Sequence, residues 1–143
     1  MALLAGVATG PRADRIFEMI GRYDVAEFPM RALFPPVKEG DPDWRDYYGL
    51  LNVPHHYHNG GVWPFIGGFY VAALVRSGLL AKANDVLGRL AELNRSGEFN
   101  EWHHGATGEP MGVRDQAWSS GMYIYAYECV RRGAPIHFNE PSR

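Results

Sequence analysis

Apolar residues at helical spacing constrain the fold of this chain more than any other feature of its sequence. Such residues recur at intervals of three and four, the spacing that places side chains on one face of an α-helix. They do so over residues 13–20, 65–74, 83–91 and 118–129. No segment alternates apolar and polar residues for long enough to predict a β-strand. We therefore expect an all-α fold.

Glycine and proline set the expected helix boundaries, because proline favours the first turn of a helix and glycine its end. The short link between the second and third helices predicts an antiparallel hairpin. The predicted helices run from Pro11 to near Gly21, from Pro64 to Ser77-Gly78, from Ala83 to around 94–97, and from near Asp115 to Gly133.

A long connection separates the first two helices and lacks any helical pattern. It runs from Tyr23 to Tyr57 and contains five prolines together with several aromatic residues. A connection of this length inside a compact domain is usually functional or disordered, and its aromatic residues argue against disorder. We interpret it as an ordered loop lying over one end of the helices.

Length and charge restrict the partners of the chain. Its 143 residues are enough for a single domain with its own core. A net charge of −2 gives no basis for binding nucleic acid or an anionic membrane, and there is no apolar run of about 20 residues. We expect a cytoplasmic location. The single cysteine, Cys129, lies at an apolar helical position and is interpreted as a buried structural thiol.

The stretch from His58 to Pro64, His-Asn-Gly-Gly-Val-Trp-Pro, holds the densest run of special residues. Its two glycines allow backbone conformations and close approaches that a side chain would block. The start of a helix would then bring together the polar groups of His58 and Asn59 and the flat face of Trp63. Together these side chains could bind a sugar. The same residues equally allow a loop that only makes a turn before the helix.

A second loop, over residues 98–114, holds the better candidate for chemistry. Phe99-Asn100-Glu101-Trp102 puts a carboxylate between an amide and an indole. A carboxylate partly shielded by aromatic side chains can act as a base on a water molecule. A surface glutamate in a turn is the alternative interpretation.

Five histidines lie in these two loops: His55, His56, His58, His103 and His104. They do not form the i, i+4 helical pair that preorganises zinc ligands. We interpret them as ordinary polar or sugar-facing side chains, and we expect neither a metal nor another cofactor.

Four motifs follow one another between residues 57 and 119. They are Tyr-His-Asn-Gly-Gly-Val-Trp-Pro over 57–64, Phe-Asn-Glu-Trp over 99–102, Thr-Gly-Glu-Pro over 107–110 and Gln-Ala-Trp-Ser over 116–119. In this order they resemble the C-terminal part of (α/α)6-barrel glycoside hydrolases. The alkaline and neutral invertases and the amylo-α-1,6-glucosidase or glycogen-debranching type are most similar, and the processing α-glucosidases are more distant. The resemblance implies that residues 1–143 form one domain, similar to the C-terminal third of such a catalytic domain.

The resemblance also implies roles for particular residues. Glu101 would be the general base of an inverting mechanism and would deprotonate the attacking water. The substrate, an α-glucoside or related sugar, would be bound by His58, Asn59, Trp63, Trp102, Gln116 and Trp118.

Inverting hydrolysis needs a second carboxyl group as the general acid, roughly 6.5–9.5 Å from the base. In the families named above this acid comes from an earlier helical hairpin. None of Asp41, Asp43, Asp46 and Asp115 matches its motif. We therefore expect αα-hairpins of the toroid type in a partial barrel, which binds carbohydrate weakly or not at all and hydrolyses nothing alone.

Two other functions stay open. The chain could be a helical module that binds a sugar or a protein partner without chemistry. It could instead be a sugar epimerase or isomerase of related fold, which would use histidines as acid and base.

Helices of a partial barrel keep apolar faces without neighbours, and self-association covers such faces. Ala2–Val7 is nearly all apolar and predicts the last turns of a helix with nothing ahead of it to pack on. We expect a homo-oligomer whose contact includes Ala2–Val7 and part of the Phe65–Leu74 face, or association with a missing barrel portion.

Overall fold

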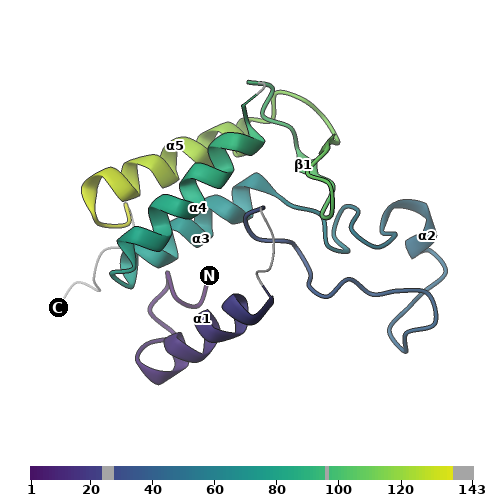
Figure 1. The fold of residues 1–143 in the computed structure, drawn as a ribbon, viewed down its shortest axis with the longest axis horizontal. Coiled ribbons are helices and arrows are strands. Elements are labelled where there is room, and N and C mark those ends of the chain that lie inside the picture. The colour runs from purple at the N-terminus through teal and green to yellow at the C-terminus, as the bar shows by residue number, and fades with distance from the viewer. Residues whose placement is uncertain (24–27, 96, 137–143) are drawn as a thin grey trace.

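Three long helices pack on one another at the centre of the computed structural model, which describes residues 1–23, 28–95 and 97–136. They are α3 (Pro64–Arg76), α4 (Leu80–Leu93) and α5 (Ala117–Arg132). Each of the three contacts the other two, and α3 and α4 form the predicted hairpin. The helix α1 (Pro11–Tyr23) lies beside this group, with its apolar face against the same core (Figure 1).

The helix α3 is the centre of the core because its sequence is apolar on nearly every side. Val71, Ala72 and Leu74 are completely buried. Two glycines in its first half let its neighbours approach closely: a Cβ atom on Gly67 would lie 2.8 Å from the Leu90 side chain of α4. A Cβ atom on Gly68 would lie 2.7 Å from the carbonyl oxygen of Met122 in α5. The absence of two side chains therefore sets the spacing of all three helices.

The observed boundaries follow the predicted ones with small shifts. The start of α1 at Pro11 is confirmed, and α1 continues two residues past Gly21. The helix α5 begins at Ala117 rather than near Asp115, because Asp115 has a positive φ of 57° that is incompatible with a right-handed helix. Gly133, with φ +66°, ends α5 as expected.

The N-terminal segment does not form the helix end expected over Ala2–Val7. It is a series of turns that ends at Gly6, with φ +71°. Leu3 and Leu4 are buried in the same core as α3, and the α3 residues from Tyr70 to Val75 are buried as well. Many of these apolar groups are therefore covered within one chain, although Val7 is still 69% exposed. The intermolecular contact through Ala2–Val7 and the Phe65–Leu74 face stays a prediction.

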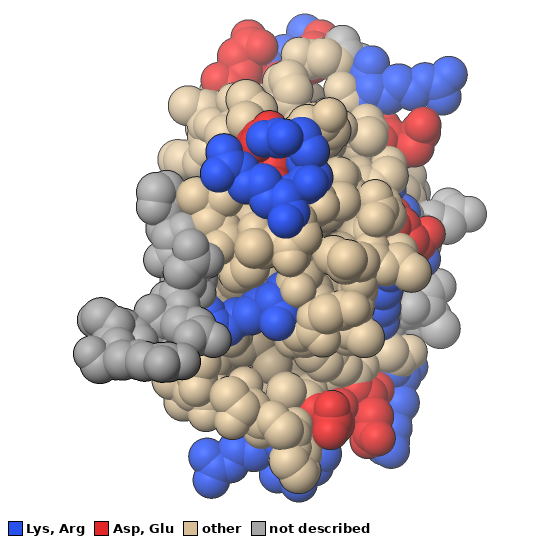
Figure 2. All heavy atoms as spheres, turned by 90° about the vertical axis from the view of Figure 1, so that its left-hand side faces the viewer, with Lys and Arg blue, Asp and Glu red and all other residues tan. Residues whose placement is uncertain are grey.

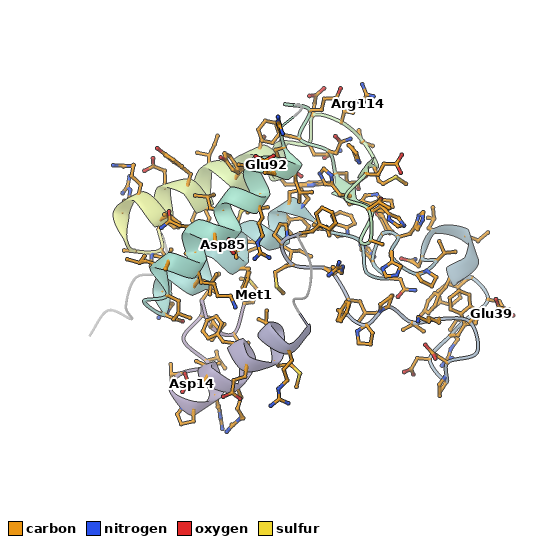
Figure 3. The ribbon with its side chains drawn as sticks, in the orientation of Figure 1. Met1, Asp14, Glu39, Asp85, Glu92 and Arg114 are labelled. Atoms are coloured by element: carbon orange, nitrogen blue, oxygen red, sulfur yellow. The ribbon has the colours of Figure 1, made fainter. Side chains whose placement is uncertain are left out.

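The remaining segments gather at the end of the bundle where α3 and α5 begin (Figure 1). They contain the short helix α2 (Tyr48–Leu51) and an antiparallel pair of two-residue strands, β1 (Trp102–His103) and β2 (Pro110–Met111). These strands are too short for an alternating pattern to reveal them. Figure 3 shows how far the loops spread, with Glu39 and Arg114 lying at widely separated points of this end. Of the connection predicted over Tyr23–Tyr57, residues 24–27 lie outside the described part.

The opposite end of the bundle, where α5 finishes, is largely uncharged, with basic and acidic groups scattered over it (Figure 2). Glu128 pairs there with Arg131 at 2.7 Å and Arg132 at 3.2 Å. Cys129 is completely buried, as predicted. Among the helices of the described ranges, none is long and apolar enough to cross a membrane.

We predict that Gly68→Ala destabilises the fold by about 1–3 kcal/mol, the usual cost of overpacking. The added methyl group would meet the Met122 carbonyl oxygen at 2.7 Å, and a backbone atom cannot move aside as a side chain can. Urea unfolding measures the effect. Gly121→Ala in α5 is the matched control, because nothing lies within 4 Å of the added Cβ atom; it should be neutral or stabilise by up to about 1 kcal/mol. Equal stabilities of the two variants would contradict the close α3–α5 contact.

Candidate active site

Glu101 lies immediately before β1, and a bulge in the opposite strand holds its carboxylate. The Glu101 N–H donates to the Val113 carbonyl at 2.8 Å, while the Val113 N–H donates to Glu101 Oε2 at 3.3 Å. Since Trp102 pairs with Met111, both Gly112 and Val113 stand opposite Glu101. The positive φ of Gly112, 71°, is typical of such a bulge. The backbone of this hairpin therefore fixes the position of the candidate base.

Gly112 also makes room for the glutamate. A Cβ atom there would lie 2.6 Å from Glu101 Oε2 and 2.7 Å from Cδ1 of the Trp102 indole. Only glycine combines this backbone conformation with so close an approach. The carboxylate consequently lies beside the edge of the indole, as the sequence interpretation of Phe99-Asn100-Glu101-Trp102 required.

The first turn of α5 anchors the strand that leads to Glu101. The buried Ser119 hydroxyl donates to the Asn100 carbonyl at 3.0 Å, and the Gln116 N–H donates to the Phe99 carbonyl at 3.0 Å. Gln116 is thereby hydrogen-bonded to Phe99, which precedes the candidate base by two residues. Trp118, two residues further on, has 49% of its surface exposed.

The hairpin is joined on its other side to the turn that precedes α3. Val62 and His103 exchange two backbone hydrogen bonds, of 2.8 and 2.9 Å, and the Gly105 N–H donates to the His55 carbonyl at 2.8 Å. A Cβ atom on Gly61 would collide with the Tyr57 carbonyl, and one on Gly105 with the Gly60 carbonyl. Gly61 thus allows the tight turn of the His58–Pro64 motif, and Gly105 allows the hairpin loop to touch that turn.

An aromatic cluster fills the junction between the turn and the hairpin. Tyr57 is at its centre: its ring stacks on His58 at 4.2 Å between centroids and meets Trp63 edge-on at 5.0 Å and Trp102 edge-on at 5.8 Å. The His56 ring lies 5.7 Å from the Trp102 ring. Tyr57 was not selected from the sequence as a site residue, although it directly precedes the His58–Pro64 motif.

The predicted sugar-binding residues divide into a buried and an exposed group. Asn59 is only 4% exposed, and its amide is engaged by the backbone of Val37 at 2.7 Å and of Asn52 at 2.8 Å. Trp63 and Trp102 are 5% and 7% exposed, and the Trp63 indole N–H donates to the Tyr57 carbonyl. His58, Gln116 and Trp118 keep accessible surface. Direct contact with a sugar stays a prediction for all six residues.

Three imidazoles meet where the turn and the hairpin loop touch. The His104 ring lies 4.8 Å from His56 and 6.0 Å from His55, centroid to centroid. His104 Nδ1 accepts hydrogen bonds from the backbone N–H groups of Ala106 and Thr107 at 3.3 and 3.2 Å. This acceptor role requires a neutral ring. Burial, followed by the nearby His56, lowers the pKa of His104, and burial followed by His104 lowers the pKa of His55.

His103 points into the protein rather than toward this group. It is 1% exposed, and its Nδ1 lies 3.2 Å from the Gly108 carbonyl oxygen, which assigns the proton to Nδ1. Burial lowers the pKa of His103 as well. Within the described ranges, no group of three or more His, Cys, Asp or Glu side chains is arranged to hold a metal ion.

Residues 1–132 match the family described as alkaline and neutral invertase. Among curated proteins, the chain is 28% identical over 137 residues to cytosolic invertase 1 of Oryza sativa subsp. japonica, covering 88% of this chain and 24% of the relative. It is 25% identical over 113 residues to the mitochondrial alkaline/neutral invertase C of Arabidopsis thaliana, covering 76% and 17%. The chain thus spans a quarter or less of the length of these relatives.

A solved structure shares the fold. The GH63 mannosylglycerate hydrolase from Thermus thermophilus, determined in complex with glucose, superposes with a TM-score of 0.65 at 20% identity. The superposition covers 91% of this chain and 29% of the hydrolase chain. The helices described above therefore have the arrangement found in part of a much longer glycoside hydrolase.

We predict that acid destabilises the fold through His55, His103 and His104. Their folded-state pKa values lie below the ordinary value of about 6.5, so the unfolded chain binds more protons. The stability that these three neutral histidines contribute is complete above the ordinary histidine pKa. It is lost as the pH falls from that value through the lowered pKa of each folded-state histidine. Urea unfolding at about pH 7.5 and 5.5 should show this loss.

His104→Asn should reduce that pH dependence, because the asparagine oxygen can accept the same two backbone hydrogen bonds and does not titrate. His58→Asn, at an exposed position stacked on Tyr57, is the control and should keep the wild-type dependence. An unchanged pH dependence in His104→Asn would show that His104 has no part in the acid destabilisation.

Proposed function

The chain belongs to the alkaline and neutral invertase family, and on that basis we propose that it contributes the general base, Glu101, to an inverting glycosidase site. The family is one of glycoside hydrolases with an (α/α)6-barrel fold, of which this chain forms an α/α-hairpin portion. The proposed substrate is an α-glucoside or a related sugar. A glucose complex of a protein with similar fold supports this substrate class.

The observation that carries the proposal is the placement of the Glu101 carboxylate. It accepts a hydrogen bond from the Val113 N–H at the Gly112–Val113 bulge and lies beside the Trp102 indole, on a segment whose backbone is joined to the His58–Pro64 turn and to the start of α5. In an inverting mechanism the base must accept a proton from a water molecule on one face of the sugar. A carboxylate fixed by backbone atoms is preorganised for this role, because it does not reorient when the substrate arrives.

The proposed sugar-binding surface consists of three accessible residues from the two segments that are hydrogen-bonded to the Glu101 hairpin and to the strand leading into it. His58, Gln116 and Trp118 supply a ring nitrogen, an amide and an indole face, and sugars offer both hydroxyl groups and apolar ring faces to such groups. The buried Asn59, Trp63 and Trp102 would support this surface from behind. Carbohydrate is therefore the proposed ligand.

We propose that the isolated chain does not complete a catalytic cycle. Inversion requires a general acid across the glycosidic bond, and the four candidate aspartates of the loops do not match the family's acid motif. Asp41, for example, accepts a hydrogen bond from the Lys38 N–H and takes part in a local turn. The small share of the relatives that this chain spans supports the same proposal.

A second candidate is an epimerase or isomerase that uses histidines for proton transfer. The contact between His104 and His56, with ring centroids 4.8 Å apart, is the observation that favours it. Such an enzyme would interconvert a free monosaccharide in a histidine-dependent way and would release nothing from a glycoside. A non-catalytic helical module would bind sugar and do neither.

The cytoplasmic location is also a proposal. The relatives are named as cytosolic in one case and mitochondrial in another.

We predict no hydrolysis of aryl α-glucosides, sucrose or maltose by the purified chain. Product release is measured with the wild type and with Glu101→Gln, which keeps the size of the side chain but removes its basicity. Turnover by the wild type would refute the proposed inactivity. If that turnover disappeared in Glu101→Gln, the role of Glu101 as the base would be established; if it persisted, that role would be refuted.

We predict a homo-oligomer in solution, formed through α5. Ile124 and Tyr127, three residues apart on one face of this helix, are 62% and 50% exposed, and exposed apolar surface of this kind favours association. Light scattering at micromolar concentration should give a mass above 16.0 kDa. Ile124→Glu should restore the monomer, whereas Met19→Glu, at an exposed apolar position of α1, should not. A monomeric wild type would refute the prediction.

A further inference from the structure

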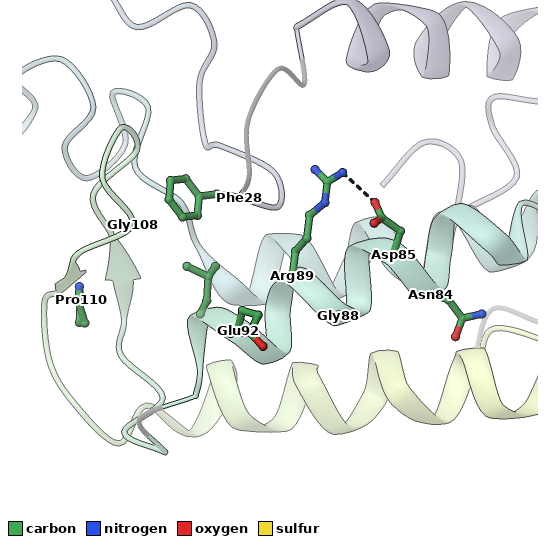
Figure 4. A pocket seen from close by; sticks show the side chains of 9 residues that line it. Phe28, Asn84, Asp85, Gly88, Arg89, Glu92, Gly108 and Pro110 are labelled. Carbon is green, nitrogen blue, oxygen red and sulfur yellow. Dashed lines mark ion pairs between the residues drawn. The ribbon is translucent and has the colours of Figure 1, made fainter.

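A groove of about 780 Å³ runs along the exposed side of α4, and none of the residues assigned above to catalysis or sugar binding lines it. Its walls come from three parts of the chain. They are Phe28, the α4 residues between Asn84 and Leu93, and Gly108 and Pro110 of the hairpin (Figure 4). Its volume is within the range of about 300–1,000 Å³ that small-molecule sites occupy.

Gly88 forms the middle of the groove and leaves the surface of α4 bare. A Cβ atom at this position would have nothing within 4 Å. Glycine costs about 0.5–1 kcal/mol in a helix relative to alanine, and no packing contact of α4 requires it here. What its absent side chain provides is space next to the helix backbone, into which a flat ligand can settle.

One end of the groove offers an aromatic ring. A Cβ atom on Gly108 would overlap the Phe28 ring, so this ring rests directly on the hairpin backbone. The half-buried Leu93 lies at the same end and adds apolar surface. The position of the ring is thus set by the hairpin, and its accessible part lines the groove.

The other end offers paired charged groups. Arg89 Nη2 lies 2.8 Å from Asp85 Oδ2, and both side chains rise from α4 on the side where Phe28 lies (Figure 4). Glu92, which precedes Leu93 and lies nearer the Phe28 end, is paired with Arg95 at 3.4 Å. Because each charge has an opposite partner, the groove has little net charge to attract an ion or a charged peptide. It does present both hydrogen-bond donors and acceptors.

We propose that this groove is a second carbohydrate-binding site, which takes one neutral sugar ring of a mono- or disaccharide. The apolar face of the ring would lie over Gly88 and against Phe28, while neighbouring hydroxyl groups would bond with the Asp85 carboxylate and the Arg89 guanidinium. A neutral polyhydroxyl ring can use all three features of the groove. They are the open space over Gly88, the Phe28 ring and the paired charges of Asp85 and Arg89. The site is separate from Glu101 and does not depend on catalysis there.

Amide NMR titration of the complete chain with maltose and with sucrose tests the proposal. At least one of the two sugars should shift the resonances of Phe28 and of residues 84–93. Gly88→Leu, which fills the groove without meeting another atom at its Cβ, should weaken this binding about tenfold or more, a loss of about 1.4 kcal/mol. Phe28→Leu should also weaken it, by removing the flat ring.

Gly121→Leu is the matched control, because Gly121 is also an exposed helical glycine with nothing within 4 Å of its Cβ. This variant and Glu101→Gln should bind at the groove as the wild type does. Absence of shifts at residues 84–93 with both sugars, or unchanged binding in Gly88→Leu, would overturn the proposal. Shifts confined to Trp63, Trp118 and their neighbours would overturn it too, while supporting the sugar surface beside Glu101.

Discussion

Direct backbone contact between the turn over residues 57–62 and β1 is the constraint on which the rest of the structure depends. Val62 and His103 exchange two hydrogen bonds there, and the lack of a side chain at Gly105 lets the hairpin loop approach the Gly60 carbonyl of the turn. The turn leads directly into α3 and the hairpin leads into α5. The same contact therefore links the starts of α3 and α5, two of the three long helices that form the core.

The residues around the candidate base divide into those that support the site and those that a ligand can reach. Asn59 binds the backbone at Val37 and Asn52 with its amide, and Trp63 donates its indole N–H to Tyr57. Both contribute to a site by keeping loops in place. His58 and Trp118 retain surface that a ligand can reach. The buried Asn59 amide and Trp63 indole N–H are satisfied within the protein, which leaves the exposed side chains for a ligand.

The two faces of this chain that offer sugar-binding chemistry arise from one hairpin. Its bulge at Gly112 positions Glu101 on one side, and its loop at Gly108 supports Phe28 on the other. Both glycines have positive φ, 71° and 73°, a backbone conformation that a residue with a side chain adopts only with strain. A change in this short hairpin would therefore alter the surroundings of the candidate base and the α4 groove together.

The sequence by itself determined the helices, their approximate ends and the candidate base. Helical spacing and proline or glycine at the boundaries are local properties, so the positions of α1, α3, α4 and α5 were largely readable, as was the buried Cys129. The ordered motifs also indicated the family and singled out Glu101. These features can be recognised without knowing which distant residues come into contact.

Only the tertiary structure decided how these parts meet. The segment Ala2–Val7 forms turns rather than the end of a helix, and it buries Leu3 and Leu4 in the same core as α3. The two-residue strands, the central place of Tyr57 and the groove at Gly88 depend on residues far apart in the chain. The periodic pattern of a sequence does not predict which two residues pair or where a glycine leaves open space. Both depend on residues that are distant in the sequence and become neighbours only on folding.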